Sequence, residues 1–132
     1  MTNIPAKFDW VNARSACSLD QAFEELRLGV EEDIKAINTL RKYSDETGYR
    51  LTRNNSGDVF NVRRNGSVKP AVTFSIRANQ IEIADDASSR KHFVDLTLND
   101  EGRCKLKIGD EEFEHWQVRR RALEKLFFPS TN

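Results

Sequence analysis

The chain has 132 residues and a mass of 15.2 kDa, and its 21 basic and 21 acidic residues leave no net charge. This length, with 38% hydrophobic residues, indicates a single domain over residues 1–132 and excludes an intrinsically disordered chain, which combines low hydrophobicity with high net charge. The charge balance also disfavours a strongly basic tail, although it leaves room for a local basic patch. No apolar run is long enough to span a membrane, and the segment from Met1 to Trp10 lacks the pattern of a secretory signal, so we expect a cytoplasmic protein.

The chain contains two cysteines, Cys17 and Cys104, and two histidines, His92 and His115. They show none of the short paired spacings of a zinc site, so the sequence predicts neither a metal nor a cofactor. A disulfide framework would require more cysteines and an export signal, and we therefore interpret both cysteines as small apolar side chains in a reducing cytoplasm. A reactive Cys104 is the alternative, but the register predicted below places His92 roughly 20 Å away from it, too far for a catalytic pair.

Residues 1–17 are predicted to form a strap that lays Phe8 and Trp10 on the core, because large aromatic side chains gain from burial. Ser18, followed three residues later by Gln21, is typical of a capping box that opens a helix over residues 18–45. The apolar stripe of this helix recurs at steps of three and four residues and comprises Leu19, Phe23, Leu26, Val30, Ile34, Ile37 and Leu40.

From residue 49 to residue 108 the apolar period changes to two, which predicts six short strands joined by short loops. The alternating positions, strand by strand, are Tyr49 and Leu51; Phe60 and Val62; Val72, Phe74 and Ile76; Ile81 and Ile83; Val94, Leu96 and Leu98; and Cys104, Leu106 and Ile108. Only one face of this antiparallel meander is apolar, so one face packs against the core and the other meets water or a partner.

The hairpin registers follow from the requirement that residues paired across two strands share a face. In the last hairpin a three-residue loop over residues 100–102 sets Leu98 against Cys104, Leu96 against Leu106, and Val94 against Ile108. In the first hairpin the same requirement places Leu51 opposite Phe60 and Tyr49 opposite Val62. The second hairpin cannot close as a tight turn at Asn65 and Gly66, so we expect a longer loop, or a bulge near Pro70.

A second helix is expected over residues 111–128, with an apolar stripe of Phe113, Trp116, Leu123 and Phe127 widened by Val118, Ala122 and Leu126. Residues 111–114 could instead return along the sheet as a strand, because periodicity over four residues cannot decide. The predicted fold is α+β in two layers: a six-stranded antiparallel meander sheet with one face covered by a long N-terminal helix and a C-terminal helix. The first helix is longer than the sheet, so either residues 30–43 overhang and form a homodimer, or the helix lies diagonally with its end packed by residues 1–17.

No signature of a common catalytic site occurs, which favours a protein that is not an enzyme. Asp85 and Asp86 form a carboxylate pair that would suit magnesium or acid–base chemistry, but a solvated turn explains them. Four carboxylates gather where the second helix is expected to begin, and helix capping is a sufficient explanation for them: Asp110, Glu111, Glu112 and Glu114.

The run of Arg119, Arg120 and Arg121 is the most unusual local feature. On a helical projection Arg119 falls inside the apolar arc. It must therefore pair with a carboxylate, extend past the core edge with its stem on Trp116, or belong to an anion- or partner-binding patch.

The outer face of the sheet is a second candidate surface. Its five basic residues outnumber its two acidic ones, Glu82 and Asp95; the basic residues are Arg50, Arg63, Arg77, Lys105 and Lys107. Asp95 lies opposite Lys107 in the predicted register, and the two are expected to neutralise each other. Phe93 is the only aromatic side chain on this face, too few to stack nucleic-acid bases, which favours ordinary solvent exposure.

Three functions follow as hypotheses. The first is a small cytoplasmic interaction module without enzymatic activity, acting through self-association or a protein partner. The second is a nucleic-acid or anion binder that uses the outer sheet face and residues 119–121. The third is a small-ligand carrier or enzyme with a pocket between sheet and helices around Trp116, Tyr49 and Arg119.

Overall fold

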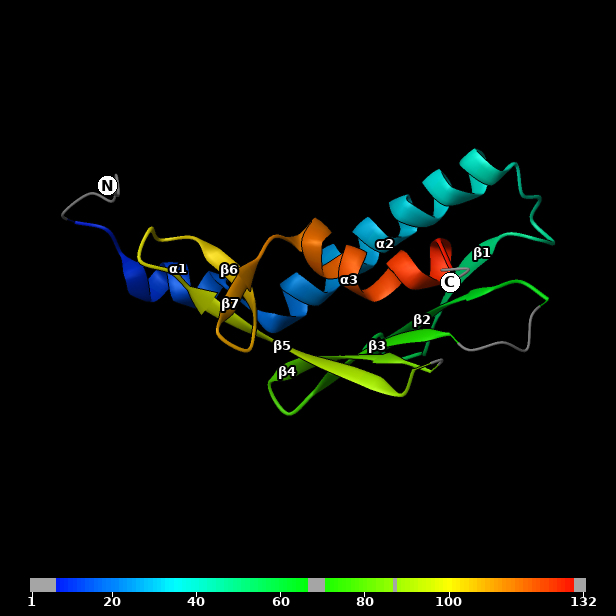
Figure 1. The fold of residues 1–132 in the computed structure, drawn as a ribbon. Coiled ribbons are helices and arrows are strands. Elements are labelled where there is room, and N and C mark those ends of the chain that lie inside the picture. Colours follow the sequence, from blue (N-terminus) through cyan, green and yellow to red (C-terminus); the bar gives the residue numbers. More distant parts are fainter. Residues whose placement is uncertain (1–6, 67–70, 87, 130–132) are drawn as a thin grey trace.

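The computed structural model describes residues 7–66, 71–86 and 88–129. In chain order its elements are α1 (Trp10–Ala16), α2 (Leu19–Arg41), β1 (Tyr49–Arg53), β2 (Val59–Arg64), β3 (Val72–Arg77), β4 (Gln80–Asp85), β5 (Arg90–Leu98), β6 (Cys104–Ile108), β7 (Glu111–Phe113) and α3 (His115–Phe127). The strands form one antiparallel sheet in sequence order, and α2 and α3 lie side by side over it (Figure 1). The α+β fold with a meander sheet and two covering helices is therefore confirmed. No helix in the described ranges has the length and apolar character needed to cross a membrane.

Over the described residues the sheet has seven strands rather than the six predicted. After the turn at Gly109, which has a φ of 61°, β7 pairs with β6 and sets Phe113 against Leu106. The helix expected from residue 111 begins only at His115, and the alternative of a return strand is the correct one. Glu111 and Glu112 therefore belong to a strand, so the expectation that the whole acidic cluster caps the helix is wrong. Glu114 alone caps α3, in a reciprocal arrangement with Gln117.

The long helix α2 begins where the sequence indicated, since the Ser18 hydroxyl accepts a hydrogen bond from the Gln21 backbone N–H at 3.2 Å. It ends at Arg41 rather than near residue 45. Lys42 adopts a left-handed conformation with a φ of 57°, which ends the helix. Ile37 is the last buried residue of the helix, and Leu40, one turn further, is 66% exposed.

The strap predicted over residues 1–17 contains the short helix α1, and residues 1–6 lie outside the described part. Trp10 is 63% exposed, so the expectation that it packs on the core is wrong. Phe8 is half-buried and lies against Gly102, where an added Cβ would come within 2.9 Å of the Phe8 ring. Helix α1 lies at the β5–β6 end of the molecule, far from the end of α2, so it does not pack the α2 terminus (Figure 1).

The strand registers agree with the pattern of one apolar face. The last hairpin has the predicted register, with Leu98 opposite Cys104 and Asp95 opposite Lys107. In the first hairpin the predicted pairs are wrong by two residues: Leu51 lies opposite Val62. The cause is the turn, which closes on a hydrogen bond from the Asn54 backbone N–H to the Val59 carbonyl.

The connection between β2 and β3 is longer than a tight turn, as expected, since Val62 lies opposite Val72. Pro70, where the bulge was suggested, lies outside the described residues.

The core lies between the inner sheet face and the helices. Phe60 and Phe74 are almost fully buried and stack with ring centroids 4.6 Å apart, and Phe23 of α2 contacts Phe60 at 5.0 Å. Val94 and Leu106 are buried on the same face. The outer face is more open, with Phe93 46% exposed, although Ser75 is buried there.

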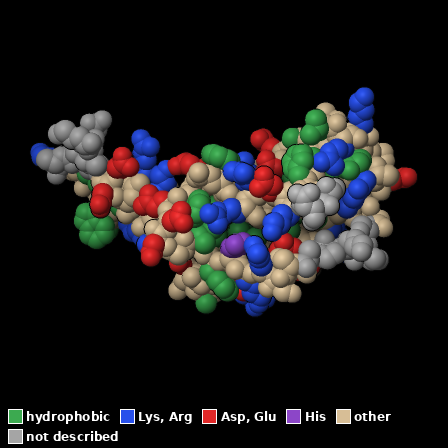
Figure 2. Space-filling view, viewed as in Figure 1, with side chains coloured by type: hydrophobic (Ala, Val, Ile, Leu, Met, Phe, Trp, Pro, Cys, Tyr) green, Lys and Arg blue, Asp and Glu red, His purple; other side chains and the backbone are tan. Residues whose placement is uncertain are grey.

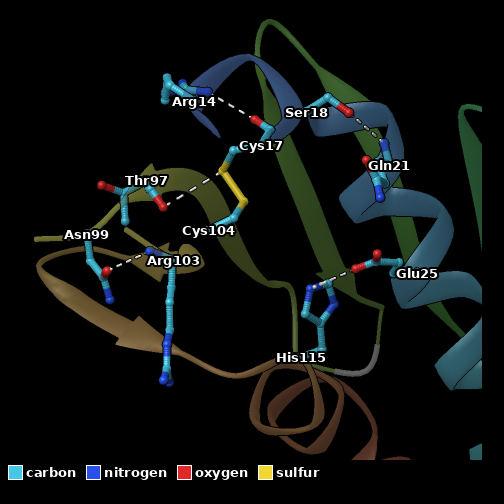
Figure 3. The surroundings of a disulfide bond; sticks show 10 residues. All are labelled: Arg14, Cys17, Ser18, Gln21, Glu25, Thr97, Asn99, Arg103, Cys104 and His115. Atoms are coloured by element: carbon cyan, nitrogen blue, oxygen red, sulfur yellow. Dashed lines mark hydrogen bonds and ion pairs between the residues drawn. A yellow bond between two sulfur atoms is a disulfide. The ribbon is translucent and has the colours of Figure 1, made fainter. Parts of the chain in front are cut away.

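Cys17 and Cys104 form a disulfide, with Cα atoms 5.4 Å apart (Figure 3). The interpretation of both cysteines as unpaired side chains is therefore wrong, as is the alternative of a reactive Cys104 thiol. The bond joins the end of α1 to the first residue of β6, across a sequence separation of 87. Nothing in the local pattern indicated it, because the two positions meet only after the sheet has formed.

Replacing both cysteines by serine, Cys17→Ser with Cys104→Ser, is expected to lower the free energy of unfolding by about 3 kcal/mol, because a long loop is no longer closed in the unfolded chain. Urea denaturation followed by circular dichroism measures the change. Reductant should produce the same loss in the unmodified protein and leave the double variant unaffected. Two thiols that alkylate readily in the folded, unreduced protein would contradict the bond.

Candidate interaction groove

An apolar groove of about 400 Å³ runs between α2 and α3. Its floor is part of the buried core and is formed by Ile37, Leu123 and Phe127. Its rim carries three large apolar side chains that remain exposed: Leu40 at 66%, Trp116 at 55% and Phe128 at 53%. We call these six residues the α2–α3 groove.

Three contacts hold α2 and α3 parallel beside the groove. The His115 Nε2 lies 3.3 Å from a Glu25 carboxylate oxygen near the start of both helices (Figure 3). Arg119 binds Asp33 at 2.7 Å in the middle, and the Arg41 guanidinium donates to the Phe127 carbonyl at 3.0 Å near both ends. Because the partners advance together along the chain, the two helices run in the same direction.

Gly29 lets the Arg119 side chain cross α2. A Cβ at Gly29 would lie 2.5 Å from the Arg119 Nη1 and 2.9 Å from its Cδ, so the space that a side chain would fill is occupied by the arginine. Arg119 is therefore a paired arginine at the core edge, one of the alternatives that the helical projection allowed. It reaches Asp33 only because position 29 has no side chain.

The three consecutive arginines of α3 have different partners in the structure. Arg119 pairs with Asp33, Arg120 lies 3.4 Å from Glu124 on the exposed side, and Arg121 lies over the Phe113 ring at 4.5 Å. The hypothesis of one anion-binding patch made by the whole run is not supported by this arrangement, because two of the three guanidinium groups already have carboxylate partners.

On the outer sheet face Arg50 lies directly opposite Arg63, because the first hairpin is shifted by two residues from its predicted register. Some of its charge is compensated within the chain: Lys105 forms an ion pair with Glu114, and Arg77 lies 3.8 Å from Glu82. Asp95, opposite Lys107, accepts a hydrogen bond from Gln80 at 3.0 Å. Binding of nucleic acid by this face stays a prediction.

The three residues predicted to form a pocket are only partly brought together. Trp116 and Arg119 line the groove, but Tyr49 lies beneath it. The Tyr49 ring packs 4.8 Å from the Phe127 ring and its hydroxyl donates to the Leu126 carbonyl at 2.8 Å, while burial raises the pKa of that hydroxyl. Tyr49 therefore anchors the end of α3.

Trp116 was expected in the core stripe. This expectation is wrong: Trp116 is 55% exposed, and the buried residues of α3 are Val118, Ala122, Leu123 and Phe127. The groove itself could not be predicted from the sequence, since Leu40 and Trp116 belong to the predicted apolar stripes and only the placement of the two helices leaves them exposed.

The carboxylates that the sequence suggested for metal or acid–base chemistry, Asp85 and Asp86, lie where β4 ends. Across the described ranges, no group of three or more His, Cys, Asp or Glu side chains is placed to hold a metal ion. Asp86 accepts a hydrogen bond from the Ala71 backbone N–H at 3.3 Å, a contact that holds a loop in place.

Gly29→Ala tests the contact between Arg119 and α2. Alanine normally stabilises a helix interior by about 1 kcal/mol relative to glycine, but here its Cβ displaces Arg119 from Asp33, so we expect no gain in the unmodified chain. In an Arg119→Met background the gain of about 1 kcal/mol should return, and urea denaturation measures both. The matched background Arg120→Met should behave like the unmodified chain. An equal effect of Gly29→Ala in all three backgrounds would contradict the contact.

His115 is predicted to make stability depend on pH. Burial is the main cause that lowers the pKa of His115 below its ordinary value of 6.5, and its Nδ1 is buried without a hydrogen-bond partner among the described residues, while Glu25 acts in the opposite direction. The unfolded chain then binds the proton more readily, so stability is fully present above the ordinary pKa and is lost as the pH falls through it.

We expect His115→Gln to flatten the fall in unfolding free energy between about pH 7.5 and about pH 5.5, and Glu25→Gln to steepen it. Urea denaturation at a series of pH values measures both variants. Identical slopes in the unmodified chain and His115→Gln would refute this assignment.

No protein-family model, curated protein or solved structure matches this chain. Its function is therefore inferred from the geometry of its own surfaces, of which the α2–α3 groove is the most apolar described above.

Proposed function

We propose that this protein is an interaction module without enzymatic activity, and that it forms a homodimer through the α2–α3 groove. The exposed rim residues Leu40, Trp116 and Phe128 carry the proposal. Apolar side chains gathered around an open groove mark the surfaces by which domains associate, because association removes them from water. The groove is open along its length, which favours another protein surface over an enclosed small ligand.

The parallel direction of the two helices supports a second copy of the chain as the occupant. Trp116 lies near one end of the groove, and Leu40 and Phe128 lie at the other; Trp116 and Phe128 are about 18 Å apart along α3. A twofold axis across the middle of the groove would place each Trp116 on the Leu40 and Phe128 of the other copy. Such a surface is self-complementary, as a closed dimer requires.

The charged side chains that line the groove are paired within the chain, since Arg119 binds Asp33 at 2.7 Å and Arg120 lies 3.4 Å from Glu124. The groove therefore offers mainly apolar contacts, which favours a partner that presents the same kind of apolar side chains.

The exposed apolar area is sufficient for a small interface. A large aromatic side chain offers roughly 200 Å², so half-exposed Trp116 and Phe128 with Leu40 leave about 300 Å² in each copy. Two copies would bury about 600 Å² of apolar surface, which is about half of an interface at the lower end of the specific range.

The disulfide bears on where such a dimer would form. The sequence predicts a cytoplasmic location because Met1 to Trp10 lacks the pattern of a secretory signal, whereas the Cys17–Cys104 bond favours a different compartment. Disulfides persist in oxidising compartments and are rare in the cytosol, so we propose an oxidising environment for the folded protein.

The oligomeric state tests the proposal. Light scattering on a size-exclusion column should give about 30 kDa, twice the chain mass, at about 100 μM. We expect Leu40→Glu and Trp116→Ala each to weaken association by at least about tenfold in sedimentation velocity, because each removes a rim contact.

The matched control is Leu28→Glu. Leu28 is 50% exposed on the same helix and does not line the groove, so this change should leave association unaltered. Thermal melting checks that all three variants remain folded. An unmodified chain that stays monomeric at the highest concentration, or a control as disruptive as Leu40→Glu, would overturn the proposal.

A further inference from the structure

The side of α3 that faces away from the groove crosses the hairpin of β4 and β5 and encloses a small hollow of about 40 Å³. In this hairpin Ile83 lies opposite His92, and Asp85 lies opposite Arg90. Because Ile83 points into the core and side chains alternate along a strand, these four residues share the inner face of the sheet. Where the hairpin reaches the edge of the molecule, the inner face of the sheet thus carries ionisable side chains instead of apolar ones.

Helix α3 adds two cations above the hairpin. Arg121 and Lys125 line the same hollow, and the buried Ile83 and Ala122 form its floor. Three cationic side chains and the imidazole of His92 therefore meet one lining carboxylate, Asp85. Figure 2 shows that Lys and Arg side chains are spread over the face of the molecule seen there, interspersed with acidic ones.

The cations of this cluster lack the partners that neighbouring cations have. Within the part of the chain that the structure describes, the side chains of Arg90, His92 and Lys125 form no hydrogen bond or ion pair. The Arg121 guanidinium lies 4.5 Å from the centre of the Phe113 ring and forms no ion pair with another described residue. By contrast, Arg119 and Arg120 each have a carboxylate within 3.4 Å.

Positive charges that converge on one hollow repel each other, and a bound anion removes that repulsion. We propose that Arg90, His92, Arg121 and Lys125 bind a tetrahedral oxyanion of the phosphate type. Guanidinium groups provide paired N–H donors that match phosphate oxygens, the ammonium group provides a compact charge, and the imidazole provides one further N–H. The small size of the hollow, about 40 Å³, favours a compact anion.

The site is independent of the proposed dimer, because it lies on the other side of α3 from the groove. Phosphate can arrive as the free ion or on a larger molecule, and both present the same terminal oxygens. Two probes therefore separate the sources: inorganic phosphate and O-phosphoserine, a phosphomonoester.

The test is a titration at constant ionic strength, followed by calorimetry and by the NMR signals of the His92 side chain. We expect saturable binding of inorganic phosphate that shifts the His92 signals. Equal binding of O-phosphoserine would assign the site to a phosphate group on a larger molecule, and binding of inorganic phosphate alone would assign it to the free ion.

Arg90→Gln, Arg121→Gln and Lys125→Gln combined should weaken phosphate binding by at least about tenfold, and Lys125→Gln alone by a smaller factor. The matched control combines Arg50→Gln, Arg63→Gln and Arg77→Gln, which removes the same charge from the outer sheet face and should change binding by less than about twofold. Absence of saturable binding, or equal weakening in the two triple variants, would overturn the proposal.

Discussion

The apolar face of the sheet has to be covered across its whole width, and this requirement positions both long helices. Six strands place their apolar residues on one side, and Phe60, Phe74 and Val94 become fully inaccessible only when α2 and α3 lie over them. One helix is too narrow for this task, since a helix with its side chains measures about 10 Å across. The two helices must therefore lie side by side, and the line of contact between them, with the α2–α3 groove, is open to the surface.

Arg119 determines how α2 and α3 contact each other. Two helices in contact usually interdigitate apolar side chains, whereas here an arginine crosses above Gly29 and binds Asp33. Its long side chain occupies the space above Gly29. Arg119 also lines the apolar groove between the helices, whose floor is the core and whose rim is Leu40, Trp116 and Phe128.

Helix α3 is the element that both proposed surfaces share. Its groove side carries Trp116 and Phe128, and its opposite side carries Arg121 and Lys125 above the β4–β5 hairpin. At the far end of the molecule the disulfide joins α1, which has no buried residue of its own, to β6. The covalent bond there supplies a connection that apolar burial does not provide.

The sequence by itself determined the elements whose signal is local. Ser18 capped the long helix, the alternation from Tyr49 to Ile108 defined the inner sheet face, and the loop over residues 100–102 gave the last hairpin its register. It failed where few residues carried the signal: the strand β7, the shifted first hairpin and the exposed Trp116.

Only the tertiary structure decided which distant residues meet. Cys17 and Cys104 pair, and Arg119 reaches Asp33. Arg90 and His92 share one hollow with Arg121 and Lys125, which lie about 30 residues further along the chain. The reason is physical: periodicity reports which way a side chain points from its own element, whereas contacts between elements depend on how helices and strands are placed against each other.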